Sequence, residues 1–118
     1  MDCLFCSIIK GEIPSTKVYE DDLCYAFFDI NPQAPVHCLV VPKVHIESAN
    51  DVTPENSAVV AHIFSVIPKI VKAAGLMKGY KIVCGYRVVT NIGEHGCQSV
   101  KHLHFHILAG KKLSENMG

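Results

Sequence analysis

Three histidines alternate with apolar residues between positions 102 and 108, where the chain reads HLHFHIL. Side chains alternate between the two faces of a β-strand, so this period of two predicts a strand with His102, His104 and His106 on one face. The apolar residues between them then face a core. Neighbouring imidazoles on such a face lie about 6–7 Å apart. Exposure alone does not explain three histidines on one face of a strand. Histidine can act as a nucleophile, proton carrier or metal ligand near neutral pH, so the row indicates one of these roles.

Length and charge limit the classes of function. The chain has 118 residues, of which 49% are hydrophobic, and this predicts a single domain over residues 1–118 with one core. Eleven basic and eleven acidic residues give a formal net charge of zero without a block of like charge. This balance argues against partners such as nucleic acid or an anionic membrane. The first residues show no basic region and no long apolar run, so we expect a cytoplasmic protein without a signal or membrane span.

Cysteine occurs six times, and its positions suggest two roles. Without a secretion signal, a disulfide framework is not expected. Cys24, Cys38 and Cys84 lie in apolar runs and are predicted to fill the core as small hydrophobes. Cys3 and Cys6 form a CxxC with metal-ligand spacing, and a closed zinc site would need two more ligands from histidine. A redox CxxC is the alternative, but no thioredoxin-like βαβ pattern follows it.

The rest of the sequence predicts two helices and five strands. A short helix covers residues 5–10 and ends at Gly11, and a long one runs from Thr53 as N-cap to Gly75. Pro68 lies inside the long helix and is expected to kink it. The predicted strands cover residues 18–20, 23–29, 36–41, 81–90 and 101–109. These elements predict an α+β domain built on an antiparallel sheet.

Several blocks of the sequence resemble the histidine-triad (HIT) family, in its branch of nucleotide-binding phosphoramidate hydrolases. The family motif, His-x-His-x-His followed by two apolar residues, matches HLHFHIL at every position. CLFCSIIKGEIPSTKVYED, AFFDINPQAPVHCLVVPKVH and YRVVTNIGEHGCQSVKHLHFHIL resemble the family in order and spacing. The resemblance covers nearly the whole chain and implies a HIT-like fold with a five-stranded antiparallel sheet, one long helix and one short helix. It also implies a homodimer formed through the long helix and strand 81–90, with one sheet continuous across both subunits.

The resemblance implies hydrolysis of a purine nucleoside phosphoramidate at its P–N bond. His104 would be the nucleophile that takes up the nucleotidyl group, with its tautomer fixed by the carbonyl of His102. His106 would donate to the phosphate oxygens or the leaving group, and His37 matches a family histidine near the phosphate. Water would then release a nucleoside 5′-monophosphate with retention of configuration at phosphorus.

Contacts to the nucleotide are also implied by the resemblance. Asp29 would accept hydrogen bonds from both ribose hydroxyls, although by itself it reads as a turn aspartate at a strand end. Asn91 and Ser99 flank a glycine-containing loop and would donate to the phosphate. His62 and His95 are not expected to take part. The candidates for an apolar slot around the base are Phe5, Ile9 and Ile30.

Members of the wider superfamily that carry the CxxC hold a structural zinc ion. The corresponding residues in this chain are Cys3, Cys6, His45 in PKVH, and His102. Two thiolates and two imidazoles satisfy tetrahedral zinc without an open position, so the ion would be structural rather than catalytic. As a zinc ligand, His102 could not also serve as acid or base, which leaves His104 and His106 as the working pair.

Two departures from the family pattern leave alternatives open. Cys97 stands where a glycine is usual, and the C-terminal KKLSENMG lacks the Trp-Pro-Pro-Gly segment that shapes the leaving-group pocket in many relatives. A dinucleoside polyphosphate hydrolase of the same superfamily and a purine-nucleotide-binding scaffold protein therefore remain as alternatives. His106 disfavours a nucleotidyl transferase, which usually has glutamine there. An apolar slot does not decide between adenosine and guanosine.

Overall fold

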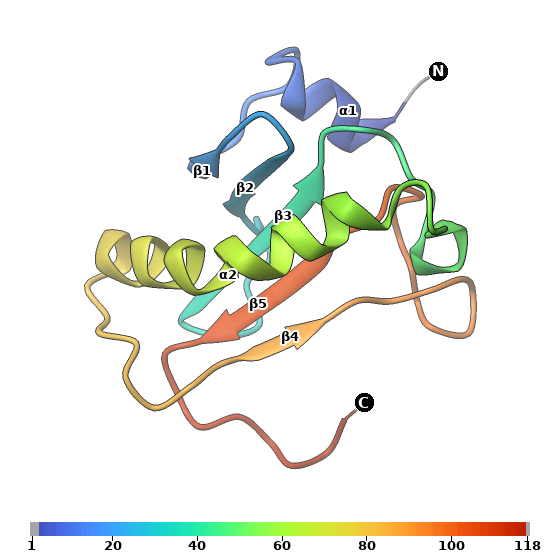
Figure 1. Cartoon of the computed structure of the whole chain (residues 1–118). Helices are drawn as coiled ribbons and strands as arrows, with labels where there is room; N and C mark the ends of the chain where they lie inside the picture. The colour runs from blue at the N-terminus through green and yellow to red at the C-terminus, as the bar shows by residue number, and fades with distance from the viewer. Residues whose placement is uncertain (1–2, 118) are drawn as a thin grey trace.

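The architecture is one sheet with a helix on each face. The computed structural model describes residues 3–117 (Figure 1). The elements are α1 (Leu4–Ile9), β1 (Lys17–Glu20), β2 (Cys24–Phe28), β3 (Val36–Pro42), the 3-10 helix η1 (Ala49–Asp51), α2 (Ser57–Lys78), β4 (Arg87–Val89) and β5 (Phe105–Ala109). The strands form an antiparallel sheet in the order β1-β2-β3-β5-β4. The predicted α+β fold, with five antiparallel strands, one long helix and one short helix, is confirmed.

The central strands β2 and β3 are buried on both faces because each face carries a helix. Alternate residues, such as Ala26 and Val40, pack beneath α2 in the larger core. The residues between them, such as Phe27 and Leu39, pack with Phe5 of α1 in a smaller core on the other face. Burial on both faces explains why these strands read as continuous apolar runs instead of alternating. The smaller core is the one that reaches the histidines.

Two of the three predicted core cysteines are buried. Cys24 and Cys38 are fully buried in the larger core, as predicted, but Cys84 is exposed. The prediction for Cys84 is wrong because residues 79–86 form an irregular surface connection, in which Gly85 has φ +98°. The predicted strand 81–90 accordingly shrinks to β4.

Helix α2 begins later than predicted, at Ser57 instead of just after Thr53. The side chain of Asn56 accepts the N–H of Thr53 at 2.7 Å, and the carbonyl of Thr53 accepts the N–H of Ser57 at 2.8 Å. These bonds close a separate turn ahead of the helix. The helix then continues through Pro68.

The predicted end of α2 at Gly75 is also wrong, because the helix continues to Lys78. Gly79 ends it in the left-handed conformation, with φ +79°, which glycine adopts without strain. A Cβ on Gly75 would lie 2.7 Å from Cγ1 of Ile82 and 2.9 Å from the carbonyl oxygen of Tyr80. Gly75 is therefore a packing glycine that lets the following segment cross close to the helix.

By length and composition, α2 is long and apolar enough to cross a membrane. In this structure it lies across β3 and β5 (Figure 1). Its buried residues are Val59, Ile63, Val66, Ile67, Ile70, Val71, Ala74 and Gly75. They lie at helical spacing and face the sheet, as in a core helix of a globular domain.

The strand predicted for residues 101–109 is shorter, because β5 begins at Phe105. Before it, the N–H of Leu103 donates to the carbonyl of Ile46 at 2.6 Å, and the N–H of His102 donates to Val100 at 2.9 Å. These bonds draw the chain away from the sheet ladder. His102 therefore precedes the strand instead of continuing the row of His104 and His106.

Candidate active site and metal-binding group

His104 has a tautomer fixed by the backbone. It lies just before β5, is 3% exposed, and places Nδ1 2.7 Å from the carbonyl oxygen of His102. A carbonyl oxygen only accepts hydrogen bonds, so Nδ1 carries the proton and the lone pair of the neutral ring lies on Nε2. A neutral imidazole oriented in this way has the lone pair that a nucleophile needs.

His106 is oriented by a second chain of hydrogen bonds. The N–H of Gln33 donates to Nδ1 of His37 at 2.9 Å, so the proton of the neutral His37 ring lies on Nε2. That Nε2 lies 2.9 Å from Nδ1 of His106 and donates to it. The proton of neutral His106 is thereby placed on Nε2, where it can be offered to a ligand.

Burial keeps the rings of His106 and His37 uncharged near neutral pH. Burial lowers the pKa of His106 to about 4, and the proximity of His104 and His37 adds to this shift. Burial also lowers the pKa of His37, although the carboxylate of Asp29 opposes the effect. The hydrogen-bond directions given above apply to these neutral rings.

Asp29 lies at the end of β2 beside this histidine pair. Its Oδ2 is 3.5 Å from Nε2 of His37 and 4.0 Å from Nδ1 of His106. Its Oδ1 accepts the N–H of Asn31 at 2.8 Å, which holds the carboxylate in place. A carboxylate fixed next to two imidazoles can accept hydrogen bonds from a ligand or balance positive charge on a ring.

A mostly apolar cavity of about 320 Å³ opens beside His104 and His106. Its polar residues, Asp29 and Ser99, lie near the histidines. The apolar lining includes Leu4, Phe5, Ile8, Phe27, Ile30 and Leu39. Larger hollows lie along α2 and the connection to β4, but no histidine or carboxylate is found among the described residues that line them. The cavity at the histidines combines apolar walls with a few polar groups, as small-molecule sites do.

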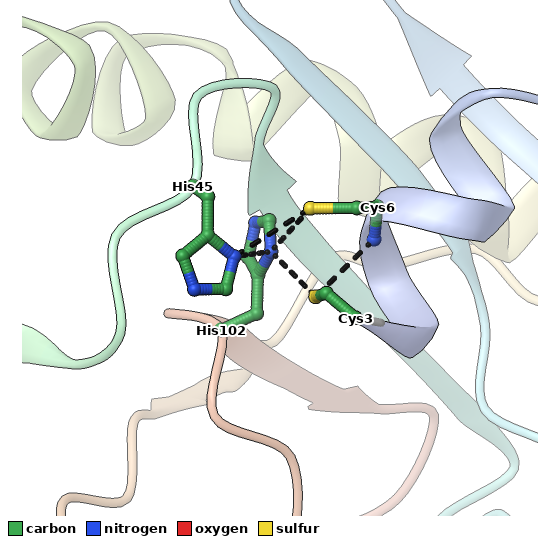
Figure 2. A group of neighbouring side chains, drawn as sticks. All are labelled: Cys3, Cys6, His45 and His102. Atoms are coloured by element: carbon green, nitrogen blue, oxygen red, sulfur yellow. Dashed lines mark hydrogen bonds between the residues drawn. The ribbon is translucent and has the colours of Figure 1, made fainter. Parts of the chain in front are cut away.

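Two cysteines and two histidines bring four donor atoms together beside this cavity (Figure 2). Cys3 and Cys6 come from the start of α1, His45 follows β3, and His102 precedes β5. Nε2 of His102 donates to the carbonyl of Pro42 at 2.9 Å, which leaves the lone pair of Nδ1 directed at the group. All four donor atoms lie within 4.8 Å of one another.

Four of the six separations between these donors are close to those of a tetrahedral ion. Nδ1 of His102 lies 3.2 Å from Sγ of Cys3, 3.6 Å from Sγ of Cys6 and 3.1 Å from Nδ1 of His45. Sγ of Cys6 lies 3.5 Å from Nδ1 of His45. Zinc bonds of about 2.0–2.3 Å at tetrahedral angles require donors about 3.3–3.8 Å apart. The group could therefore bind a metal ion with small adjustments.

Comparisons with known proteins show the family of this chain. A family model of the HIT domain matches residues 10–113, which is most of the chain. The chain belongs to the HIT family. A purine nucleoside phosphoramidase from Escherichia coli K12 is 41% identical over 112 residues, which cover 95% of this chain and 90% of that protein. An uncharacterized HIT-like protein from Synechococcus elongatus is 45% identical over 113 residues, covering 96% and 94%.

Solved structures of HIT proteins superpose on nearly the whole chain. A histidine triad protein from Clostridium difficile is 55% identical with a TM-score of 0.88, and the match covers 98% of this chain and 96% of that one. A HIT family hydrolase from Clostridium thermocellum is 39% identical with a TM-score of 0.89, with the same two coverages. The resemblance found in the sequence is thereby confirmed at the level of the fold.

The structure gathers most of the residues that the HIT resemblance singled out, with two exceptions. Ile9 is not among the residues that line the cavity, and Ile8 takes that place. Asn91 does not line this cavity either, but it lies with His37 and His106 in a neighbouring hollow of about 480 Å³ that the C-terminal segment also lines. Ile30 lines the cavity while remaining 92% exposed, so it forms an edge of the opening.

Some residues of this HIT site were not found from the sequence. Gln33 orients His37 through its backbone N–H, and Pro42 orients His102 through its carbonyl. Backbone groups are common to every residue, so no sequence signal marks them.

Cys97, which replaces the usual glycine, has φ +61° in the turn before Ser99 and is exposed. Its side chain is therefore compatible with the turn, although the conformation favours glycine.

Proposed function

We propose that this HIT protein is a hydrolase that cleaves purine nucleoside phosphoramidates through a nucleotidyl intermediate on His104. The carrying observation is the bond from Nδ1 of His104 to the carbonyl of His102, which leaves an Nε2 lone pair in a ring that lines the cavity. The name of the Escherichia coli relative supports the substrate class.

In the first step of the proposed reaction, Nε2 of His104 attacks phosphorus and the P–N bond breaks. An anionic phosphate at the site favours the protonated ring of His106, because an opposite charge raises the pKa that burial lowers. Nδ1 of the protonated ring no longer accepts from His37; its proton and the Nε2 proton of His37 would both turn to Oδ2 of Asp29, which lies 4.0 Å and 3.5 Å from these nitrogens and balances the charge. The protonated ring gives its Nε2 proton to the leaving nitrogen, which departs as an amine.

In the second step, water attacks phosphorus and the bond to His104 breaks. His106, neutral after the first step, accepts the proton that the water loses. The product is a nucleoside 5′-monophosphate, and two displacements retain the configuration at phosphorus. The same groups thus act as acid and then as base.

The cavity supports a nucleoside beside the proposed reacting phosphate. Phe5 and Ile30 would border the base, and Asp29 would accept bonds from the ribose hydroxyls through the carboxylate that Asn31 holds. Ser99 would donate to the phosphate. Because these walls are apolar, they favour a purine by its area and do not select adenine over guanine.

We also propose that the four-donor group of Cys3, Cys6, His45 and His102 holds a structural zinc ion. The donor chemistry and spacing support this assignment, since two sulfurs and two imidazoles complete a tetrahedral shell. With every position filled by protein, the ion would tie α1 to the segment before β5 and take no part in the reaction. One zinc per chain is expected in protein purified without chelator.

The proposed activity is tested by release of AMP from adenosine 5′-phosphoramidate. Wild-type protein is expected to turn over, whereas His104→Ala, which lacks the nucleophile, should lose at least about 10³-fold in kcat. His95→Ala removes an exposed loop histidine outside the cavity and should retain wild-type turnover. Faster cleavage of a dinucleoside polyphosphate would favour that alternative, and AMP binding without turnover of either substrate would favour the scaffold.

A further inference from the structure

We infer that metal occupancy of the four-donor group and nucleotide affinity of the neighbouring cavity are coupled, with Phe5 as the positioning residue between them. The inference rests on the proposed nucleotide and zinc sites. It adds that each ligand strengthens the binding of the other.

Helix α1 belongs to both sites. Cys3 and Cys6 are two of the four donors, while Leu4, Phe5 and Ile8 of the same helix line the cavity. Sγ of Cys3 also accepts the N–H of Cys6 at 3.4 Å and caps the helix. A helix of six residues is too short to be stable alone, so its position depends on its packing and on the ligands it supplies.

Phe5 touches both the metal-binding group and the nucleophile. Its ring is 4% exposed and lies edge-on to His102, with centroids 5.9 Å apart, and to His104, with centroids 5.1 Å apart. The remainder of the ring forms part of the cavity wall. A shift of α1 would therefore move the cavity wall and loosen the packing around His104 together.

His102 provides a second connection through its own backbone. Its Nδ1 faces the other three donors, and its carbonyl accepts the proton of His104 Nδ1 at 2.7 Å. A metal bond to this ring restrains the residue whose carbonyl fixes the tautomer of the nucleophile. The two connections, through Phe5 and through His102, act in the same direction.

The expected result is mutual strengthening of binding. A metal ion that fixes α1 removes motion that the nucleotide would otherwise have to restrict, so less affinity is lost to ordering. By linkage, the nucleotide must strengthen metal binding by the same factor. Couplings between two sites are commonly about 5- to 150-fold, and we expect this one within that range.

The experiment is a calorimetric titration of AMP into zinc-loaded and zinc-free protein, with circular dichroism to compare the folds. AMP should bind at least about fivefold more tightly to the zinc-loaded form. Competition with a zinc chelator, with and without saturating AMP, should show the same factor in zinc affinity. Both readouts are binding constants, so neither depends on turnover.

Variants show whether the coupling passes through Phe5. Phe5→Leu keeps an apolar residue and all four donors, so it should still bind one zinc per chain while the coupling factor falls below the wild-type value, to the part that passes through His102. Tyr25→Leu is the matched control, because Tyr25 packs in the same smaller core without lining the cavity. It should keep the wild-type factor.

Each other outcome has a separate meaning. Equal AMP affinity with and without zinc overturns the coupling but leaves the nucleotide site standing. Failure to bind AMP in either form overturns the proposed function as well, and failure to take up zinc overturns the metal site. A zinc-free chain that has lost its fold would show that the ion supports the whole domain, which also overturns a specific link through Phe5.

Discussion

Each histidine of the triad is given one role by the hydrogen bond that its other ring nitrogen makes. His102 donates from Nε2 to a carbonyl, which leaves Nδ1 for a metal. His104 donates from Nδ1 to a carbonyl, which leaves the lone pair of Nε2 free for the proposed attack on phosphorus. His106 accepts at Nδ1 from His37, which leaves a proton on Nε2. These hydrogen bonds, made mostly with backbone atoms, support the three proposed roles of metal ligand, nucleophile and proton donor for three identical side chains.

The buried neutral state of His106 predicts a loss of stability in acid. In the unfolded chain its pKa returns to about 6.5, so below that pH the unfolded state binds a proton that the folded state refuses until about pH 4. The stability that neutral His106 contributes is therefore fully present above pH 6.5 and is lost as the pH falls toward 4. At pH 5 the loss is on the order of 2 kcal/mol.

Urea unfolding measures this loss of stability when the wild type and His106→Gln are compared at pH 7.5 and pH 5. The variant has no imidazole to titrate, so its stability should fall less than that of the wild type by on the order of 2 kcal/mol. His95→Gln, at an exposed histidine, should keep the full wild-type loss. An equal loss in His106→Gln would show that other groups, such as the metal ligands, carry the acid sensitivity.

At the residue scale, the sequence indicated which residues form the candidate site but not all the contacts that they make. Alternation placed His104 and His106 together, with ring centroids 5.1 Å apart, but could not show that the bonds of Leu103 and His102 interrupt the strand. The cavity is lined by Ile8 and not by the predicted Ile9. On a helix, residues three and four positions after Phe5 both lie near the face that carries Phe5, so the sequence pattern does not separate them.

At the scale of elements, both ends of α2 differ from the prediction, one because of a local turn and the other because of packing. Thr53 is a good N-cap by type, yet the side chain of Asn56 closes a turn first. Glycine is the residue type that commonly ends a helix, yet Gly75 lies inside α2, at the point where Ile82 crosses close to it. The turn at Thr53 is local, closed by a side-chain bond three residues along, whereas Gly75 depends on contact with a later segment that a helical pattern does not contain. Strands β2 and β3 were easier to predict because they carry long apolar runs, whereas β4 and β5 are shorter than predicted.

Gly75→Ala tests whether packing outweighs helix propensity in α2. Alanine favours a helix over glycine by about 1 kcal/mol. The added Cβ would meet Ile82 at 2.7 Å and a carbonyl at 2.9 Å, and overpacking of this kind costs about 1–3 kcal/mol. We therefore expect a net loss of stability in urea unfolding. Ser65→Ala, at an exposed position of the same helix, should change stability by no more than about 0.5 kcal/mol. A stabilised Gly75→Ala would show that the segment at Ile82 yields easily.

At the scale of the whole molecule, we propose a homodimer formed by the edge of the sheet and the end of α2. β4 lies at the edge of the sheet, where its outer side can pair with a second chain. Large apolar side chains are exposed around it and along α2, namely Phe64, Leu76, Met77, Tyr80, Val83 and Tyr86. An apolar surface beside a free strand edge fits an isologous partner, which would extend the sheet across both subunits.

Light scattering coupled to size exclusion tests this dimer. The wild type should have twice the chain mass of 12.9 kDa. Leu76→Glu places a charge where 69% of the leucine is exposed in the single chain, so burial against a partner becomes costly and the mass should fall to that of one chain. Leu23→Glu, an equivalent change at an exposed leucine next to β2, should leave the dimer intact. If the wild type itself has the mass of one chain, the apolar surface is not a self-association site, and the active site described above is complete within a single subunit.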